Sequence, residues 1–272
     1  MTGPAPGLYV VATPIGNLED LSPRALRILG AALVVAAEDT RTTGKLLKMA
    51  GSGARMVSLT EHNVLARAPG LVEASRIGVV ALVSDAGTPL VADPGARLVE
   101  AAHDAGVNVV AVPGPSALAA AISVSGFEAS SLHFLGFLPR PAGERLKLLR
   151  AAASTATVLV FFESPARLGA TLQELATELR DPEVVVCREL TKVHEEAIRG
   201  RASELAPRFR ETRGEVTVVV RIEAGKETGD AEARLYIGEM KRAGARRPSA
   251  AVEAARRFGL PRQATYDMWD EV

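Results

Sequence analysis

The fold of this chain is decided by one stretch, Ser84-Asp85-Ala86-Gly87-Thr88-Pro89-Leu90-Val91-Ala92-Asp93-Pro94-Gly95. The apolar run 79–83 before it predicts a buried strand, and the segment 96–105 after it predicts a helix. A strand that ends in a polar turn with Gly and Pro, and then leads into a helix, is where α/β proteins bind ligands. The stretch therefore predicts an α/β fold with a ligand site at this turn.

Two similar turns flank this stretch. Ala12-Thr13-Pro14-Ile15-Gly16-Asn17-Leu18 lies upstream, and Val112-Pro113-Gly114-Pro115-Ser116-Ala117 lies downstream. The carboxyl ends of parallel strands meet at the same edge of a sheet, so the three turns predict one crevice with three walls. The polar clusters 38–43 and 60–63 also follow strands and belong to the same expected edge.

Strands and helices alternate through the first half of the chain. The strands are expected at 8–12, 33–36, 56–59, 79–83 and 107–112. The helices between them are expected at 22–29, with Ser22 as N-cap and Pro23 in the first helical position, and at 44–50, 65–75 and 96–105. This alternation predicts a mostly parallel sheet with helices on both faces.

From residue 126 the pattern changes to a mixed sheet. A small, Ala-rich helix at 116–125 precedes it. Strands are expected at 132–138, 157–162, 184–188, 195–199 and 215–222, and helices at 143–153, 167–179 and 202–210. We therefore expect two α/β domains, at 1–117 and 118–224, and an appendage at 225–272.

The appendage is expected to be helical. Residues 223–230 have the composition of a linker. Helices are expected at 231–243, at 249–258 with Ser249 as N-cap, and from Pro261 onward. The last two resemble a small helix-turn-helix.

Composition excludes several classes of protein. The chain has 272 residues, 47% of them apolar, and its 32 Lys and Arg balance 32 Asp and Glu, which argues against non-specific coating of nucleic acid. Its single cysteine, Cys187, excludes an internal disulfide framework and suits a reducing cytoplasm. One Cys and four His are too few for an expected zinc site. No leading signal segment is visible, and apolar runs such as 31–37 are too short to cross a bilayer, so we expect a cytoplasmic protein without membrane contact.

Six motifs together resemble the ribosomal RNA small subunit methyltransferase I family of the tetrapyrrole methylase superfamily. They span residues 8–223 in order, at 11–20, 37–41, 84–95, 112–117, 162–167 and 188–192. Residues 246–267 resemble the small C-terminal helical domain of that family more weakly. The chain departs from the family at Ala92, where Ser is frequent, and at Ala166, where His is frequent.

The resemblance implies an enzyme that methylates the 2′-oxygen of a cytidine ribose in 16S rRNA, cytidine 1402 in the family. It implies two α/β domains with S-adenosylmethionine in the cleft between them, usually in a homodimer, acting on the small ribosomal subunit. Carried over by motif, the residues that line the cofactor are Thr13, Pro14, Ile15, Thr88, Leu90, Val91, Ser116, Ala117, Phe162 and Thr217. A sulfonium cofactor requires apolar walls and backbone polar groups, which turns of this composition supply.

A ribose hydroxyl is a poor nucleophile, so its methylation needs a group that accepts the proton. Six side chains at the expected active edge are considered for this role: Glu38, Asp39, Glu61, His62, Asp85 and Glu163. The four retained as catalytic candidates are Glu38, Asp39, His62 and Asp85. Histidine ordinarily changes its charge nearest neutral pH, but His62 could equally be a surface residue. Asp39, Glu163 and Asp93 could instead cap the helices that follow them, and Asp85 could simply brace its turn.

The candidate RNA-binding residues are cationic. Arg41 and Lys192 flank motif loops and could contact phosphates, although a single cation is more often on a solvated face. Arg246 and Arg247 belong to a group of seven cations within 241–262. An RNA-binding surface and a solvated helical face are equal alternatives for that group.

Four other functions are alternatives to the leading one. A tetrapyrrole methyltransferase is disfavoured by the Thr-Pro-Ile-Gly-Asn version of the first turn and by the segment 37–41. A non-catalytic RNA-binding assembly factor would bind RNA without the cofactor. The chain has neither GxGxxG nor GxxxxGK[ST], which disfavours a nicotinamide dehydrogenase and a nucleoside triphosphatase.

Overall fold

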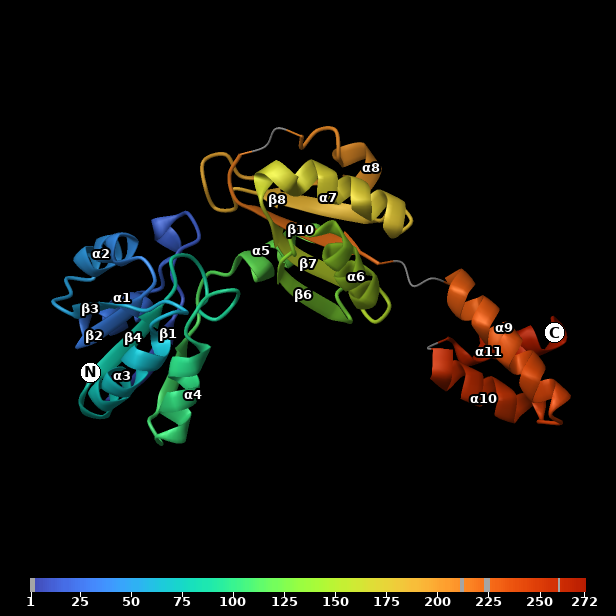
Figure 1. Cartoon of the computed structure of the whole chain (residues 1–272), viewed down its shortest axis with the longest axis horizontal. Helices are drawn as coiled ribbons and strands as arrows, with labels where there is room; N and C mark the ends of the chain where they lie inside the picture. The colour runs from blue at the N-terminus through green and yellow to red at the C-terminus, as the bar shows by residue number, and fades with distance from the viewer. Residues whose placement is uncertain (1–2, 211–212, 223–225, 259) are drawn as a thin grey trace. The chain divides into compact units, whose positions relative to one another are not determined.

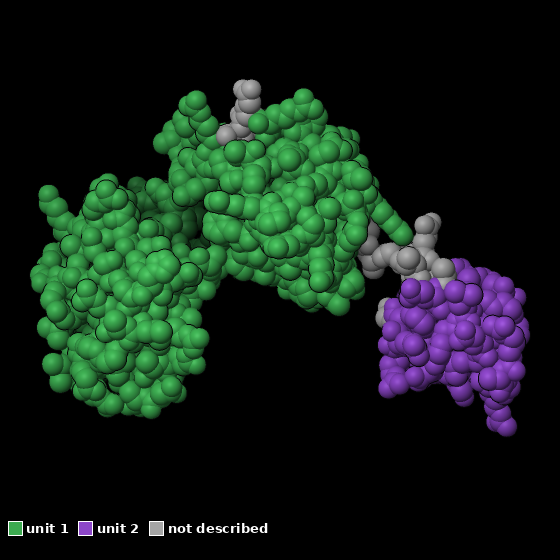
Figure 2. All heavy atoms as spheres, in the orientation of Figure 1, with its two compact units in different colours: residues 1–222 green, residues 223–272 purple. Residues whose placement is uncertain are grey.

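The computed structural model of the chain describes residues 3–210, 213–222, 226–258 and 260–272. The chain divides into two compact units, residues 1–222 and 223–272, which Figure 2 shows in green and purple. The first unit holds two five-stranded sheets. The three-domain division expected from the sequence remains a prediction.

The sequence predicts a mostly parallel first sheet, and the observed sheet is fully parallel, with strand order β3-β2-β4-β1-β5. Its strands are β1 (Gly7–Val11), β2 (Val34–Ala37), β3 (Arg55–Ser58), β4 (Val79–Val83) and β5 (Val109–Val112). Its helices are α1 (Pro23–Gly30), α2 (Thr40–Met49), α3 (Val64–Ile77) and α4 (Ala96–Asp104), with a short 3₁₀ turn, η1 (Leu18–Asp20), after β1 (Figure 1).

Alternating side chains place this sheet between two helical layers. Tyr9 and Val11 pack with α1 and α2, whereas Leu8 of the same strand packs with α3 and α4. Every residue of β4 is buried. A strand buried on both faces is expected to be continuously apolar, which explains the run that precedes the decisive turn.

The starts of two helices follow their capping residues. Ser22 Oγ accepts a hydrogen bond from the backbone N–H of Ala25 at 3.0 Å, which confirms Ser22 as the N-cap of α1. Helix α2 begins at Thr40, earlier than the expected 44, because Asp39 is its N-cap and accepts from the N–H of Arg41 at 2.8 Å. The polar segment after β2 is therefore the first turn of a helix.

The second sheet is mixed, as expected, with strand order β6-β7-β10-β8-β9. Strand β6 runs parallel to β7, and the other neighbouring strands are antiparallel. Its strands are β6 (Leu132–Phe137), β7 (Val158–Glu163), β8 (Glu183–Arg188), β9 (Glu196–Arg201) and β10 (Val216–Arg221). Its helices are α5 (Ala117–Ser125), α6 (Ala142–Ala153), α7 (Pro165–Glu178) and α8 (Ala202–Leu205).

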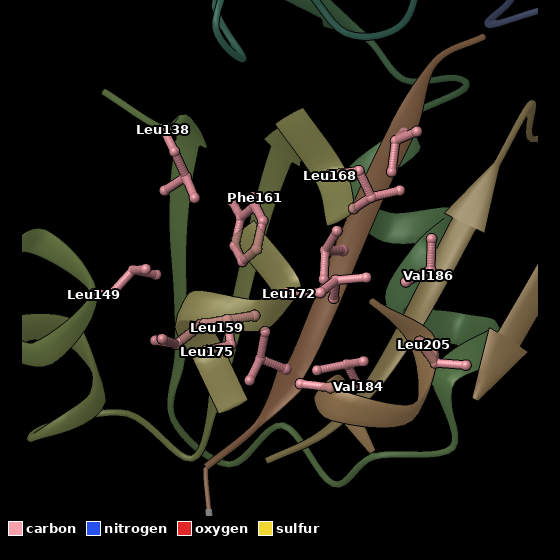
Figure 3. Close-up of a cluster of buried hydrophobic side chains, with 14 of the residues drawn as sticks. Leu138, Leu149, Leu159, Phe161, Leu168, Leu172, Leu175, Val184, Val186 and Leu205 are labelled. Carbon is pink, nitrogen blue, oxygen red and sulfur yellow. The ribbon is translucent and has the colours of Figure 1, made fainter. Parts of the chain in front are cut away.

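The core of this second half forms where α6 and α7 cover the sheet. Phe161 and Leu159 of β7 pack with Leu168, Leu172 and Leu175 of α7, all fully buried (Figure 3). Helix α8 ends at Leu205, short of the predicted 210. The carbonyl oxygens of Ala206 and Phe209 then lie against Gly169 of α7, where a Cβ atom would come within 3.1 Å of both.

The second unit is helical, with α9 (Lys226–Arg242), α10 (Arg247–Phe258), α11 (Arg262–Asp267) and the 3₁₀ turn η2 (Met268–Asp270). Ala233, Ile237, Ala254 and Met268 form its core. Among the described helices, none combines the length and apolarity that a membrane crossing needs.

Two expectations for this unit are wrong. Residues 226–230 belong to α9 rather than to a linker, and residues 223–225 of that stretch lie outside the described residues. Ser249 is not an N-cap, because α10 already begins at Arg247. Pro248 is the signal that marks this start, since proline is tolerated in the first turn of a helix and not in its interior.

Candidate active site

The three turns of the first sheet are joined by hydrogen bonds. Thr13 and Gly87 exchange backbone hydrogen bonds of 2.8 and 3.0 Å, and Thr13 Oγ1 donates to the Ser84 carbonyl oxygen at 3.1 Å. Thr88 Oγ1 donates to the Pro115 carbonyl oxygen at 3.0 Å. The prediction that these turns meet at one edge of the sheet is confirmed.

The central turn has a strained backbone. Leu90 and Ala92 have φ angles of 72° and 68°, in the left-handed region that disfavours residues with a Cβ atom by about 1–2 kcal/mol each. Packing of Leu90 against the layer that contains Leu82 and Leu98 helps to hold this conformation. Such strain is retained mainly at functional sites, where a specific backbone shape is needed.

A cavity of about 440 Å³ opens beside this turn. Its walls come from the turns of the first sheet and from β7, β8 and β10 of the second sheet. The residues predicted for the cofactor that line it are Ile15, Thr88, Val91, Ser116, Ala117, Phe162 and Thr217. The other three are not among the lining residues: Thr13 and Pro14 are buried in the first turn, and Leu90 faces the helical layer.

The first turn also contacts the loop that follows β8. The backbone N–H of Asn17 donates to Thr191 Oγ1 at 3.1 Å. A Cβ atom at Gly16 would come within 2.4 Å of Lys192 Cγ and 2.9 Å of Thr191 Oγ1, so a larger residue here would displace these side chains. The turn after β1 thus borders the cavity and also contacts the loop after β8 of the second sheet.

Three carboxylates gather in and beside the cavity. Asp85 and Asp93 line it, and Glu38 lies near both. Burial first, and then the negative charges of Glu38 and Asp85, raise the pKa of Asp93 to about 6. Burial, Asp85 and Glu61 likewise raise the pKa of Glu38.

Asp93 is the residue that sequence reasoning assigned to another role. Capping of a helix was one alternative for Asp93, but α4 begins at Ala96 with Gly95 in the N-cap position, so that alternative is wrong. The carboxylate lines the cavity instead. Its place only two residues after Val91 in the decisive turn is the signal that could have identified it.

Asp39 acts as a structural brace. Its carboxylate accepts from the N–H of Arg41 and from Arg41 Nε, which lowers its pKa. Its own backbone N–H donates to Asp85 Oδ1 at 2.9 Å. Asp39 therefore caps α2 and orients the Asp85 carboxylate. His62 and Glu61 are exposed and are not among the lining residues.

Glu163 borders the cavity, but its carboxylate is already engaged. The side chain is fully buried and accepts from Arg167 Nε at 2.8 Å, from Thr171 Oγ1 at 2.8 Å and from the N–H of Ser164 at 2.6 Å. A carboxylate that accepts from three donors is fixed in position by them. Glu163 does not cap the helix that follows, because Ser164 is the N-cap of α7; its carboxylate instead holds Arg167 and Thr171.

Cys187 also contributes to the cavity wall. Burial, followed by the negative charge of Glu195, raises the pKa of its thiol to about 11. The thiol is therefore neutral at physiological pH and serves as an apolar surface. Among the described residues, no group of three or more His, Cys, Asp or Glu is placed to hold a metal ion.

The cationic candidates fall into two groups. Arg41 is 92% exposed in its side chain, and Arg246 is exposed on the second unit. Lys192 Nζ donates to Glu189 and Glu215; burial lowers its pKa, but these hydrogen bonds raise it overall. Arg247 pairs with Asp270 at 2.7 Å and stacks on Tyr266 at 4.1 Å, so it stabilises its own unit.

Comparison with known proteins agrees with this architecture. Residues 7–206 match the model of the Tetrapyrrole (Corrin/Porphyrin) Methylases. The chain belongs to this family. Two solved structures share the fold: diphthine synthase, with a TM-score of 0.61, 18% identity and coverage of 79% of this chain and 89% of that one, and the Thermus thermophilus uroporphyrin-III C-methyltransferase complexed with S-adenosylhomocysteine, with a TM-score of 0.56, 24% identity and coverage of 79% and 97%.

Within the tetrapyrrole methylase family, the chain belongs with the ribosomal RNA small subunit methyltransferases I. The Neisseria meningitidis serogroup B relative is 41% identical over 96% of this chain and 92% of its own length. The Thermotoga maritima relative is 44% identical over 81% of this chain and 99% of its own length. This tetrapyrrole methylase is thus an S-adenosylmethionine-dependent methyltransferase.

The cavity fits the cofactor of this tetrapyrrole methylase. Ile15, Val91, Leu190 and Val216 give it apolar walls. The carboxylates of Asp85 and Asp93, which also line it, suit a cofactor that carries a positive charge. These walls and carboxylates are what a sulfonium compound with an adenine base requires.

Proposed function

We propose that this tetrapyrrole methylase transfers a methyl group to the ribose 2′-oxygen of cytidine 1402 in 16S rRNA. The relatives that match almost the whole chain are ribosomal RNA small subunit methyltransferases I. The observation that carries the proposal is the cavity that joins Thr88 and Val91 to the acidic groups Asp85 and Asp93. It offers a cofactor wall and a proton acceptor at one site.

S-Adenosylmethionine, when bound, supplies an activated methyl group on a sulfonium sulfur. Held beside Thr88 and Val91, it would give this methyl group to the ribose oxygen and would be released as S-adenosylhomocysteine. The 2′-hydroxyl must also lose its proton. The chain's contribution is alignment of the two reactants and acceptance of this proton.

Asp93 is the group we assign as proton acceptor. It lines the cavity, and its raised pKa of about 6 leaves it mostly ionised at neutral pH while keeping it more basic than an ordinary carboxylate. Asp85 and Glu38 act through their charge, which sustains that basicity. Asp39 positions Asp85 through its backbone N–H.

The small ribosomal subunit as substrate implies a cytoplasmic enzyme. Arg41 and Arg246 are exposed and are our candidates for phosphate contacts, although Arg41 also pairs with Asp39 at 3.3 Å. Lys192 and Arg247 are less exposed and are paired with acidic partners. The homodimer implied by the family resemblance is tested by analytical ultracentrifugation of the full chain. A sedimentation coefficient of a monomer would exclude it.

The proposed reaction is tested with purified protein and S-adenosylmethionine labelled in the methyl group. We expect label to enter 16S rRNA of small subunits isolated from cells that lack the enzyme, and not a porphyrin or corrin precursor. Transfer to the tetrapyrrole alone would overturn the proposal. Binding of subunits without binding of S-adenosylhomocysteine in calorimetry would instead support a non-catalytic assembly factor.

A further inference from the structure

Strand β6 departs from regular pairing beside the cavity. Phe134 pairs with Val160 of β7 and Phe137 pairs with Phe162, so three steps along β6 match two steps along β7. Gly136, with a φ of +60°, lies in this irregular segment. A bulge of this kind changes the direction of a side chain and is frequent next to active sites.

The bulge brings two aromatic rings onto the same partner. Side chains three residues apart in a regular strand point to opposite faces. Here the ring centroids of Phe134 and Phe137 lie 5.0 and 5.4 Å from that of Phe162, both in edge-to-face geometry. Phe137 therefore reaches the cavity only because of the bulge.

Phe137 is exposed although phenylalanine is usually buried. It is 64% exposed and lines the rim of the cavity, whereas Phe161 on β7 is fully buried. Edge-to-face packing on Phe162 occupies one side of the ring system and leaves most of Phe137 accessible to a ligand. An exposed aromatic ring at a cavity rim is suited to stacking with another flat group.

The backbone after Phe137 is held by two arginines. Arg167 donates to the carbonyl oxygens of Leu138 and Pro139 at 3.0 and 3.3 Å. Arg145 Nη1 donates to the carbonyl oxygens of Pro139 and Arg140 at 3.0 and 2.9 Å. The backbone that follows the ring is therefore held in place before any ligand binds, which lowers the entropic cost of ordering this segment.

Arg145 and Arg167 each donate hydrogen bonds to a glutamate as well. Glu163 accepts from Arg167 Nε at 2.8 Å, and Glu174 accepts from Arg145 Nε at 2.7 Å. These two arginines thus serve the backbone beside Phe137 rather than a phosphate group. Glu163 is a positioning residue in this arrangement.

We propose that Phe137 is a stacking platform for the nucleobase whose ribose is methylated. Proteins that recognise unpaired nucleotides stack the displaced base on an aromatic side chain. Phe137 and Asp93 line the same cavity, so a base on the ring would bring its ribose to the cavity that holds the proposed proton acceptor. This inference rests on the proposed function, because it presumes an RNA substrate.

The test compares substitutions that keep or remove the ring. We expect Phe137→Ala and Phe137→Leu to lower kcat/KM for small ribosomal subunits by roughly 10- to 100-fold, the range for loss of one base-stacking contact. Phe137→Tyr and Phe137→Trp should stay within about threefold of the wild type, because both keep an aromatic face. Calorimetry should show that S-adenosylhomocysteine binds all four variants with wild-type affinity.

Ile77→Ala is the matched control, since Ile77 is 78% exposed at the end of α3 that precedes β4, at the opposite edge of the sheet. Unchanged kcat/KM in Phe137→Ala would overturn the platform, as would equal activity of Phe137→Leu and Phe137→Tyr. A parallel loss of S-adenosylhomocysteine binding would place the ring in the cofactor site instead. If the wild type methylates no small subunits, the proposed function fails; if it does and Phe137→Ala matches it, the platform alone fails.

Discussion

Thr88 Oγ1 donates a hydrogen bond of 3.0 Å to the carbonyl oxygen of Pro115. This bond joins the turn after β4 to the turn after β5, although the two strands are separated in the sheet by β1. It closes one wall of the cavity that Thr88 and Ser116 both line. The shape of the site therefore depends on a side chain that forms part of its surface.

Loss of this bond should weaken binding of S-adenosylhomocysteine. We expect Thr88→Val, which keeps the shape of the side chain, to raise the Kd by about 2- to 10-fold, as loss of one neutral hydrogen bond implies. Thr88→Ser keeps the hydroxyl and should bind nearly as well as the wild type. Isothermal titration calorimetry measures both. Equal Kd values for the Val and Ser variants would show that the bond does not shape the site.

The activity should depend on the ionisation of Asp93. A proton acceptor works in its deprotonated form, so kcat/KM should rise with pH up to the pKa of Asp93, about 6, and level off above it. Asp93→Asn should lower kcat by roughly 10²- to 10⁴-fold and retain S-adenosylhomocysteine binding.

The variant Asp85→Asn tests the role of Asp93 in a second way, through the pH profile of the activity. Because the charge of Asp85 helps to raise the pKa of Asp93, its removal should move the rising limb of the pH profile to lower pH. An unchanged pH profile in Asp85→Asn, together with an active Asp93→Asn variant, would assign the proton transfer to another residue.

Folding stability should also depend on the ionisation of Asp93, but it should fall with rising pH where the activity rises. The folded-state pKa of Asp93 is raised from 3.8 to about 6, so the stability present below about pH 4 is lost as the pH rises through 6. Asp93→Asn removes this loss and should raise the Tm at pH 8 relative to the wild type. At pH 4 the difference should be smaller. A thermal shift assay at both pH values measures this, and equal shifts would contradict the assigned pKa.

The buried ion pair behind the cavity should matter more than exposed pairs. Glu163→Ala leaves Arg167 and Thr171 without their common acceptor and should destabilise the protein by about 3–5 kcal/mol, as removal of one partner of a buried pair does. Glu100→Ala breaks the exposed pair with Arg97 and should cost less than about 1 kcal/mol. Urea denaturation followed by circular dichroism compares the two, and equal losses would contradict a structural role of Glu163.

Much of the fold follows from local signals in the sequence. The buried run of β4 and the capping pair Ser22-Pro23 each predict an element that the structure confirms. The start of α10 was missed because Ser249 resembles an N-cap, whereas Pro248 in the first turn marks the actual start. When two neighbouring residues both resemble the start of a helix, the sequence alone does not show which one marks it; that depends on how the helix packs.

The site is less accessible to sequence reasoning because it depends on contacts between distant segments. Asp93 resembles a helix cap in the sequence, and only the proximity of Glu38 and Asp85 shows why its carboxylate is basic. Phe137 belongs to a strand that its composition predicts, but the bulge that turns its ring toward Phe162 is a property of the pairing with β7. Pairing registers are set by tertiary contacts that single-sequence patterns do not carry.

The most direct test of the central claim is a map of 2′-O-methyl groups in 16S rRNA from cells in which the gene is deleted. We expect methylation of cytidine 1402 to be absent, to return with the wild-type gene, and to stay absent with Asp93→Asn. A methylation map that is unchanged by the deletion would contradict the proposed function.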